Sequence, residues 1–191
     1  MHAITYKSEN IIKSDYIQTE GISYTDQEWA WYPMKDVNTI YYFNKPLYLY
    51  LLGREGQTME AETFIKKIGD QYIGIYKMID DYNRINDIDS THKIFLYKRL
   101  TNRIKGLYRF VLINNRETEI SSFINFDSQI KKKNLEIYNY IGNDILQRYY
   151  NVKYIKYWRN NNYQPIPSLI IILNKLFTQL KTFIRIIRLK K

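Results

Sequence analysis

Residues 64–79 read FIKKIGDQYIGIYKMI, and this stretch decides the main fold class of the chain. Its apolar side chains recur every three or four positions, which places them on one face of an α-helix. They are Phe64, Ile65, Ile68, Tyr72, Ile75, Tyr76 and Ile79. A second apolar stripe of the same spacing follows over residues 94–111, and a third helix is expected from about 122 to 149. The sequence therefore predicts a helical extension over residues 59–150.

Two β-rich runs precede this helical stretch. Residues 39–52 read TIYYFNKPLYLYLL, and Asn44-Lys45-Pro46 separates the two runs. Aromatic and branched residues on either side of Asn and Pro are typical of a hairpin or a tight strand connection. The expected fold class is therefore α+β, mostly helical, with one short strand pair.

A short aromatic helix is expected just before the strand pair, within residues 21–37. Thr25 and Glu28 have the spacing of a capping box, which predicts that Thr25 caps this helix. The chain then divides into three segments: 1–58 with the helix and strand pair, 59–150 with the helical extension, and 151–191 with a basic linker and a tail helix.

Composition excludes several classes of protein. The chain has 191 residues, enough for one domain or two small ones. It has no cysteine, which excludes disulfides, thiolate metal sites and cysteine nucleophiles. No apolar run is long enough to span a bilayer, and the first ten residues lack the apolar core of a secretory signal. The expected compartment is the cytoplasm.

The positive charge is confined to the end of the chain. The formal net charge is +10, and residues 151–191 contain nine Lys and Arg and no acidic residue. Residues 1–150 hold the other 20 Lys and Arg against 19 Asp and Glu, so they are nearly neutral. The basicity therefore belongs to the tail.

The tail also predicts an amphipathic helix. Its apolar face would include Leu169, Leu173, Leu176, Phe177 and Leu180, continued by Phe183, Ile184 and Ile187, with Lys181, Arg185 and Arg188 among the cations that flank it. A wide apolar face with cations and no acid is typical of a helix that lies in the headgroup region of an anionic membrane. The alternative is that this face packs on the helical body. Nucleic acid fits less well, because the charge lies on an otherwise apolar helix.

Three motifs could carry chemistry. Asp26, at the start of a helix and close to aromatic residues, could act as a general base, although an acid there also stabilises the helix dipole. Arg54, in the turn GREGQT at 53–58, could bind a diphosphate, although the turn could simply end a strand. Asp87 and Asp89 have the D-x-D form of a metal motif, but between two helices they are better interpreted as caps.

The stretch GISYTDQEWAWYPMKDVNTIYYFNKPLYLYLLGREGQTM, residues 21–59, resembles the C-terminal part of a bacterial family 2 glycosyltransferase domain, which has the GT-A fold. In that family a D-x-E-[W/Y] segment opens a helix, and a strand pair ending in LY-x-Y then leads to a G-R-x-G-Q-[S/T] turn. Residues 2–7 also look like an internal segment of these enzymes. The resemblance covers about residues 2–60, and the donor-binding half that holds the family's D-x-D motif would precede Met1.

The resemblance implies roles for seven residues. Asp26 would be the catalytic base, a second group would lie beside the donor diphosphate, and a third would line the acceptor site. The diphosphate group comprises Arg54, Gln57 and Thr58, and the acceptor group comprises Tyr24, Trp29 and His2. The family's usual Glu before the base is replaced here by Thr25.

The function implied is transfer of a sugar from a nucleotide sugar to a glycan or lipid-linked acceptor in cell-surface polysaccharide synthesis. The intact enzyme would use Mn²⁺ or Mg²⁺, whereas this chain alone would bind no metal and would be inactive without the donor half. The alternative is a non-catalytic helical module that binds an anionic membrane, or nucleic acid, through its basic tail. In either case we expect a peripheral location at the inner face of the cell membrane.

Overall fold

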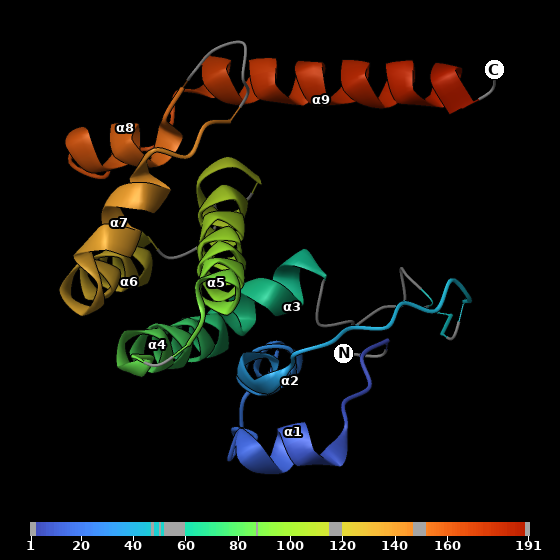
Figure 1. The fold of residues 1–191 in the computed structure, drawn as a ribbon. Helices are drawn as coiled ribbons and strands as arrows, with labels where there is room; N and C mark the ends of the chain where they lie inside the picture. The colour runs from blue at the N-terminus through green and yellow to red at the C-terminus, as the bar shows by residue number, and fades with distance from the viewer. Residues whose placement is uncertain are drawn as a thin grey trace. The chain divides into compact units, whose positions relative to one another are not determined.

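The computed structural model describes residues 3–46, 48–49, 51, 60–86, 88–114, 120–146 and 152–189, with side chains described as far as Leu180 (Figure 1). The chain forms two compact units, Met1–Arg103 and Ile104–Lys191, and we describe each unit by itself. The three segments expected from the sequence stay a prediction.

The first unit contains short helices followed by longer ones. These are α1 (Ser8–Lys13), α2 (Asp26–Trp29), the 3₁₀ helix η1 (Tyr32–Asp36), α3 (Ala61–Lys66), α4 (Ile68–Arg84) and the first part of α5 (Ser90–Arg109). The helical spacing read over residues 64–79 is confirmed, because Ile68, Ile75 and Ile79 of α4 are buried. Trp31 is fully buried beside them, and its indole Nε1 donates to Asp81 Oδ2 at 2.7 Å.

The predicted strand pair is wrong. In the part of residues 39–52 that the structure describes there is no strand, so the described chain is helical and not α+β. A helix satisfies its backbone hydrogen bonds within one segment, whereas a strand needs a second strand beside it. The described residues supply no such second strand, so the β-rich composition of 39–52 does not produce a strand in them.

The predicted capping box is also wrong. Thr25 has helical backbone angles, φ −68° and ψ −12°, and its side chain makes no cap hydrogen bond. Its hydroxyl instead accepts from Gln18 Nε2 at 3.0 Å. Glu28 is buried and accepts from the backbone N–H and the hydroxyl of Thr19, at 3.0 and 2.7 Å. Glu28 therefore binds the loop that precedes α2 through Thr19, and α2 forms without a side-chain cap.

The second unit contains the end of α5, the π-helical turn η2 (Phe110–Asn114), α6 (Ile120–Lys133), α7 (Leu135–Gly142), α8 (Tyr154–Asn160) and α9 (Ser168–Leu189). Phe123, Phe126 and Trp158 are fully buried and form its aromatic core. The third helix expected over 122–149 is broken at Asn134, whose side-chain oxygen accepts from the N–H of Ile137 at 2.8 Å and so caps α7.

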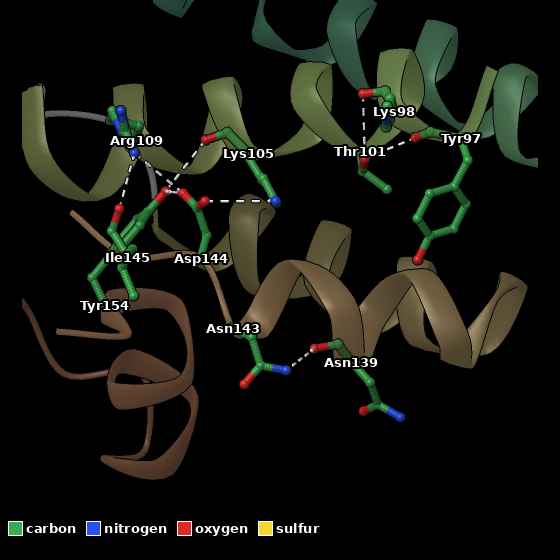
Figure 2. Close-up of polar contacts among 10 residues, drawn as sticks. All are labelled: Tyr97, Lys98, Thr101, Lys105, Arg109, Asn139, Asn143, Asp144, Ile145 and Tyr154. Carbon is green, nitrogen blue, oxygen red and sulfur yellow. Dashed lines mark hydrogen bonds and ion pairs between the residues drawn. The ribbon is translucent and has the colours of Figure 1, made fainter. Parts of the chain in front are cut away.

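Asp144 connects α5 to the segments after α7. Its carboxylate lies 3.6 Å from the ammonium of Lys105 and 3.2 Å from the guanidinium of Arg109, and it accepts from the hydroxyl of Tyr154 at 3.2 Å (Figure 2). Burial raises the pKa of Tyr154, and Asp144 adds to the rise.

Among the described residues, we find no helix with the length and apolar character needed to cross a bilayer.

Candidate functional site

The first candidate site surrounds α2 in the first unit. Asp26 opens this helix, and its Oδ2 accepts from Gln27 Nε2 at 3.0 Å. Trp29 ends the helix, and the edges of Tyr6 and Tyr16 contact its ring at centroid distances of 5.4 and 6.3 Å. The short helix thus places Asp26 near an aromatic cluster.

Tyr24 packs against α3 and is not part of the aromatic contacts around Trp29 described above. Its backbone has φ +67°, in the left-handed region, and its ring packs on Phe64 of α3 at 5.5 Å. Burial raises the pKa of Tyr24, and Asp70 adds to the rise. Tyr24 therefore connects the loop before α2 to α3 and α4.

Sequence reasoning missed two arginines beside α2. Arg99 and Arg103 lie one turn apart on α5, where Arg99 Nη2 donates to Gln27 Oε1 at 3.5 Å and Arg103 Nη2 donates to Gln71 Oε1 at 2.9 Å. The Nε of each arginine is buried and finds no acceptor among the described residues, and neither do the buried hydroxyls of Tyr6 and Tyr16. The sequence signal that could have located them is the R-x-x-x-R spacing of 99 and 103, which places both on one side of a helix beside the apolar stripe of residues 94–111.

Burial determines the electrostatics of this cluster. It lowers the pKa of Arg103 to about 10; Arg99 acts in the same direction, and Asp26 and Glu28 oppose it. Burial also raises the pKa of Tyr16 to about 12, with Glu28 and Asp26 adding to the rise. The cluster can donate hydrogen bonds to an oxygen acceptor, and we assign no reaction to it.

The structure does not describe the other four residues to which the sequence assigned a role. His2, Arg54, Gln57 and Thr58 lie outside the described residues, as does Asp87. Asp89 behaves as the expected cap, because its Oδ1 accepts from the N–H groups of Thr91 and His92 at 2.8 and 3.1 Å. Within the described ranges no three His, Asp or Glu side chains gather in a way that could hold a metal ion.

Comparison with known proteins supplies no family. No family model, no curated protein and no solved structure matches the chain. The described part of residues 39–52 also lacks the strand pair that a GT-A fragment requires. The resemblance to a family 2 glycosyltransferase is therefore withdrawn. The roles it implied for Asp26 and the other six residues stay untested predictions, and we do not propose sugar transfer.

The second candidate site is the tail helix, which forms as expected. α9 runs without interruption over Ser168–Leu189. Three leucines of its predicted apolar face, Leu169, Leu176 and Leu180, are 67%, 55% and 53% exposed. Leu173 and Phe177, on the flank of that face, are half-buried. The side chains of Lys181, Arg185 and Arg188 lie outside the described residues.

One of the nine tail cations belongs to the interior. Arg159, at the end of α8, forms an ion pair with Asp127 of α6, with Nη2 2.7 Å from Oδ1. The Asp127 side chain is 1% exposed and that of Arg159 is 9% exposed, so this charge is neutralised within the second unit. The charge that remains for an external partner therefore lies on the other eight Lys and Arg of residues 151–191.

Proposed function

We propose that this chain binds an anionic membrane surface through α9. The observation that carries the proposal is the exposed apolar face of a helix in an acid-free segment. Leu169, Leu176 and Leu180 lie within about 20° of one line along the helix at 100° per residue. Each is more than half exposed. Exposed apolar side chains aligned on a basic helix favour a lipid interface over bulk water.

The buried side of α9 supports this orientation. Ile171 lies about 200° around the helix from Leu169, and it is 6% exposed. Ile166, just before the helix, is also buried. The start of α9 is therefore held by the side opposite to the leucine face. This favours the membrane over the alternative in which the leucines pack on the helical body.

Charge supplies the second part of the attraction. A Lys or Arg close to an anionic leaflet contributes about 1 kcal/mol, and residues 151–191 carry no acid to oppose this. Lys153, Lys156 and Lys175 are exposed. Nucleic acid would use the same charge but would give the exposed leucines no role. We therefore expect binding that needs both anionic lipid and the apolar face.

The test is co-sedimentation of the full chain with liposomes. At low salt the protein should pellet with vesicles of phosphatidylglycerol and phosphatidylcholine, and it should stay in the supernatant with phosphatidylcholine alone. High salt should weaken binding, because it screens the charges. Protein that stays in the supernatant with the anionic vesicles at low salt would refute the proposal.

Two matched variants separate the apolar contribution from charge. Leu180→Asp and Gln179→Asp each add one negative charge at neighbouring exposed positions, but only the first lies on the leucine face. Losing one leucine that would enter the lipid should weaken the membrane partition constant about 10- to 100-fold beyond the effect of Gln179→Asp. Equal effects of the two variants would show that charge alone drives binding, and nucleic acid should then be tested in place of lipid.

A further inference from the structure

His92, in the first turn of α5, lies between two hydrogen-bond acceptors. Its Nε2 is 2.7 Å from the carbonyl oxygen of Val37, and its Nδ1 contacts Oδ2 of Asp89. Asp89 lies just before α5, whereas Val37 follows η1 and is 55 positions away along the chain. The side chain of His92 is 19% exposed, so little water competes for these contacts. The ring therefore ties the end of η1 to the start of α5.

The charged form of this ring is the one that satisfies both acceptors. An imidazolium carries an N–H on each nitrogen, whereas a neutral imidazole carries one N–H and presents a lone pair at the other nitrogen. A carbonyl and a carboxylate have no proton to donate in return. In either neutral tautomer, one ring lone pair would therefore face an oxygen lone pair, and loss of the proton breaks one of the two contacts.

Asp89 is the acceptor that a neutral ring should keep. Its Oδ1 accepts from the N–H groups of Thr91 and His92 at 2.8 and 3.1 Å, which fixes the carboxylate beside the ring. The backbone N–H of His92 is the main cause that lowers the pKa of Asp89, so the carboxylate is ionised while the imidazole titrates. A hydrogen bond to an ionised acceptor is roughly twice as strong as one to a neutral acceptor. The single N–H of a neutral ring therefore belongs on Nδ1, and the carbonyl of Val37 loses its donor.

The neighbouring charges favour the imidazolium. The hydrogen bond to Val37 raises the pKa of His92, burial opposes this rise, and Asp89 and then Asp36 add to it. Asp36 belongs to η1, and its carboxylate is paired with the ammonium of Lys13 of α1 at 2.9 Å. Because the pKa is raised, the charged ring persists above the ordinary histidine value of about 6.5 and is lost as pH rises through the folded-state value.

We propose that His92 is a pH-operated tie, whose protonated ring holds the chain leaving η1 against α5 and whose deprotonation releases residues 37–46 while the helices stay folded. In the described range 38–46 the structure records one backbone hydrogen bond, from the N–H of Lys45 to the carbonyl of Phe43 at 2.9 Å. Figure 1 draws this stretch after η1 as a trace without a helix or a strand. That local bond does not connect the stretch to α5, whereas the contact of His92 with Val37 does.

Nuclear magnetic resonance of the isotopically labelled full chain tests the release. As pH rises from about 5 to 9, across the range in which a histidine titrates, the carbonyl ¹³C shift of Val37 should change with the same midpoint as the His92 ring. The ¹⁵N heteronuclear Overhauser effect of residues 38–43 reports picosecond-to-nanosecond motion and should fall with that midpoint, while that of α4 stays constant. The proposal is overturned if either signal fails to follow the ring, or if α4 changes with them, which would indicate unfolding.

Asp89→Asn separates the tie from the cap. The new amide oxygen can accept from the N–H groups of Thr91 and His92, so the cap is retained. The new amide N–H can donate to Nδ1 of a neutral ring, which then carries its own N–H on Nε2 and keeps its hydrogen bond to Val37. The pKa of His92 should therefore fall, and the Val37 carbonyl shift should no longer change at alkaline pH.

His92→Phe removes the donor at every pH. At acidic pH, residues 38–43 of this variant should show the low heteronuclear Overhauser effect that the unsubstituted chain shows at alkaline pH. Release of Val37 at the unchanged midpoint in Asp89→Asn, or a high Overhauser effect in His92→Phe at acidic pH, would overturn the tie. Neither result bears on the membrane proposal for α9.

Discussion

Arg159 in the second unit and Arg103 in the first unit differ in how fully their guanidinium nitrogens are hydrogen-bonded. In the second unit Arg159 uses all three nitrogens: Nε and Nη2 donate to Asp127 Oδ1 at 2.9 and 2.7 Å, and Nη1 donates to the carbonyl of Tyr138 at 2.9 Å. The hydroxyl of Tyr108 donates to the same carboxylate oxygen. In the first unit Arg103 donates to the neutral amide oxygen of Gln71 and leaves its Nε without an acceptor in the described chain.

The pKa values follow this difference. Burial opposes the charge of both arginines, but for Arg159 the interactions with Tyr108 and Asp127 prevail and raise the pKa. For Arg103 burial prevails and lowers the pKa to about 10. A buried charge is tolerated when it is paired and hydrogen-bonded, and it is costly otherwise. The second unit therefore pairs the charge of Arg159 internally, although the indole N–H of Trp158 finds no acceptor among the described residues. In the first unit the unused donors of the described chain include two charged ones, the Nε groups of Arg99 and Arg103.

The largest expected effect is the loss of the partner of Arg159. Asp127→Leu leaves a buried guanidinium without its carboxylate and should lower the free energy of unfolding by about 3–5 kcal/mol. Combining it with Arg159→Met should restore part of that loss, because the pair is then replaced by apolar side chains. Urea unfolding followed by tryptophan fluorescence measures both. A loss under about 1 kcal/mol for Asp127→Leu would remove the contrast between the units.

A smaller effect is expected at Gly142, the last residue of α7. An added Cβ would lie 2.8 Å from Arg159 Nη1, and that guanidinium is held by Asp127 and Tyr138. Gly142→Ala should therefore destabilise the protein by about 1–3 kcal/mol. Gly106→Ala in α5 is the control, since nothing lies within 4 Å of its added Cβ. It should stabilise by about 0.5–1 kcal/mol through helix propensity, and the same sign for both variants would contradict the prediction.

Arg103 should matter much less than Arg159. Arg103→Met removes the hydrogen bond to Gln71, a weak one from Nη1 to the sulfur of Met78 at 3.7 Å, and a charge that has no ion-pair partner among the described residues. Losing the hydrogen bonds and losing the charge oppose each other, so we expect unfolding free energy to change by less than about 1 kcal/mol in either direction. The same urea titration measures it beside Arg159→Met. A loss as large as that of Arg159→Met would show that Arg103 has a strong partner outside the described residues.

The smallest expected effect is a pH dependence in the first unit. His92 Nε2 donates to the carbonyl of Val37 at 2.7 Å, and Nδ1 contacts Asp89. The hydrogen bond to Val37 and then Asp89 raise the pKa of His92, while burial opposes them. Because the folded-state pKa is raised, this contribution is fully present below the unfolded value of about 6.5 and is lost as pH rises through the folded value.

Thermal unfolding as a function of pH tests this contribution. The midpoint should fall slightly between acidic and mildly alkaline pH, and His92→Gln should show less of that fall. If His92→Gln keeps the full pH dependence, another group is responsible.

The long helices could be predicted from the sequence, because a helix closes its hydrogen bonds between residues four positions apart. The short helices α1 and α8 were not predicted, and α8 lies where a basic linker was expected. The stripes of α4 and α5 and the amphipathic α9 were all visible as local spacing, and so was the separation of charge between tail and body. Asn134 shows the limit of that approach, since a cap in the middle of a helical pattern divided one expected helix into α6 and α7.

The features that sequence reasoning missed depend on distant partners. Arg159 pairs with a residue 32 positions away, so a cation assigned to the tail lies in the core instead. Arg99 lies 72 positions from Gln27, and no motif links them. Strand propensity in residues 39–52 was evident, but a strand exists only where a second strand pairs with it. Only the tertiary structure shows that the described residues contain no second strand to pair with it.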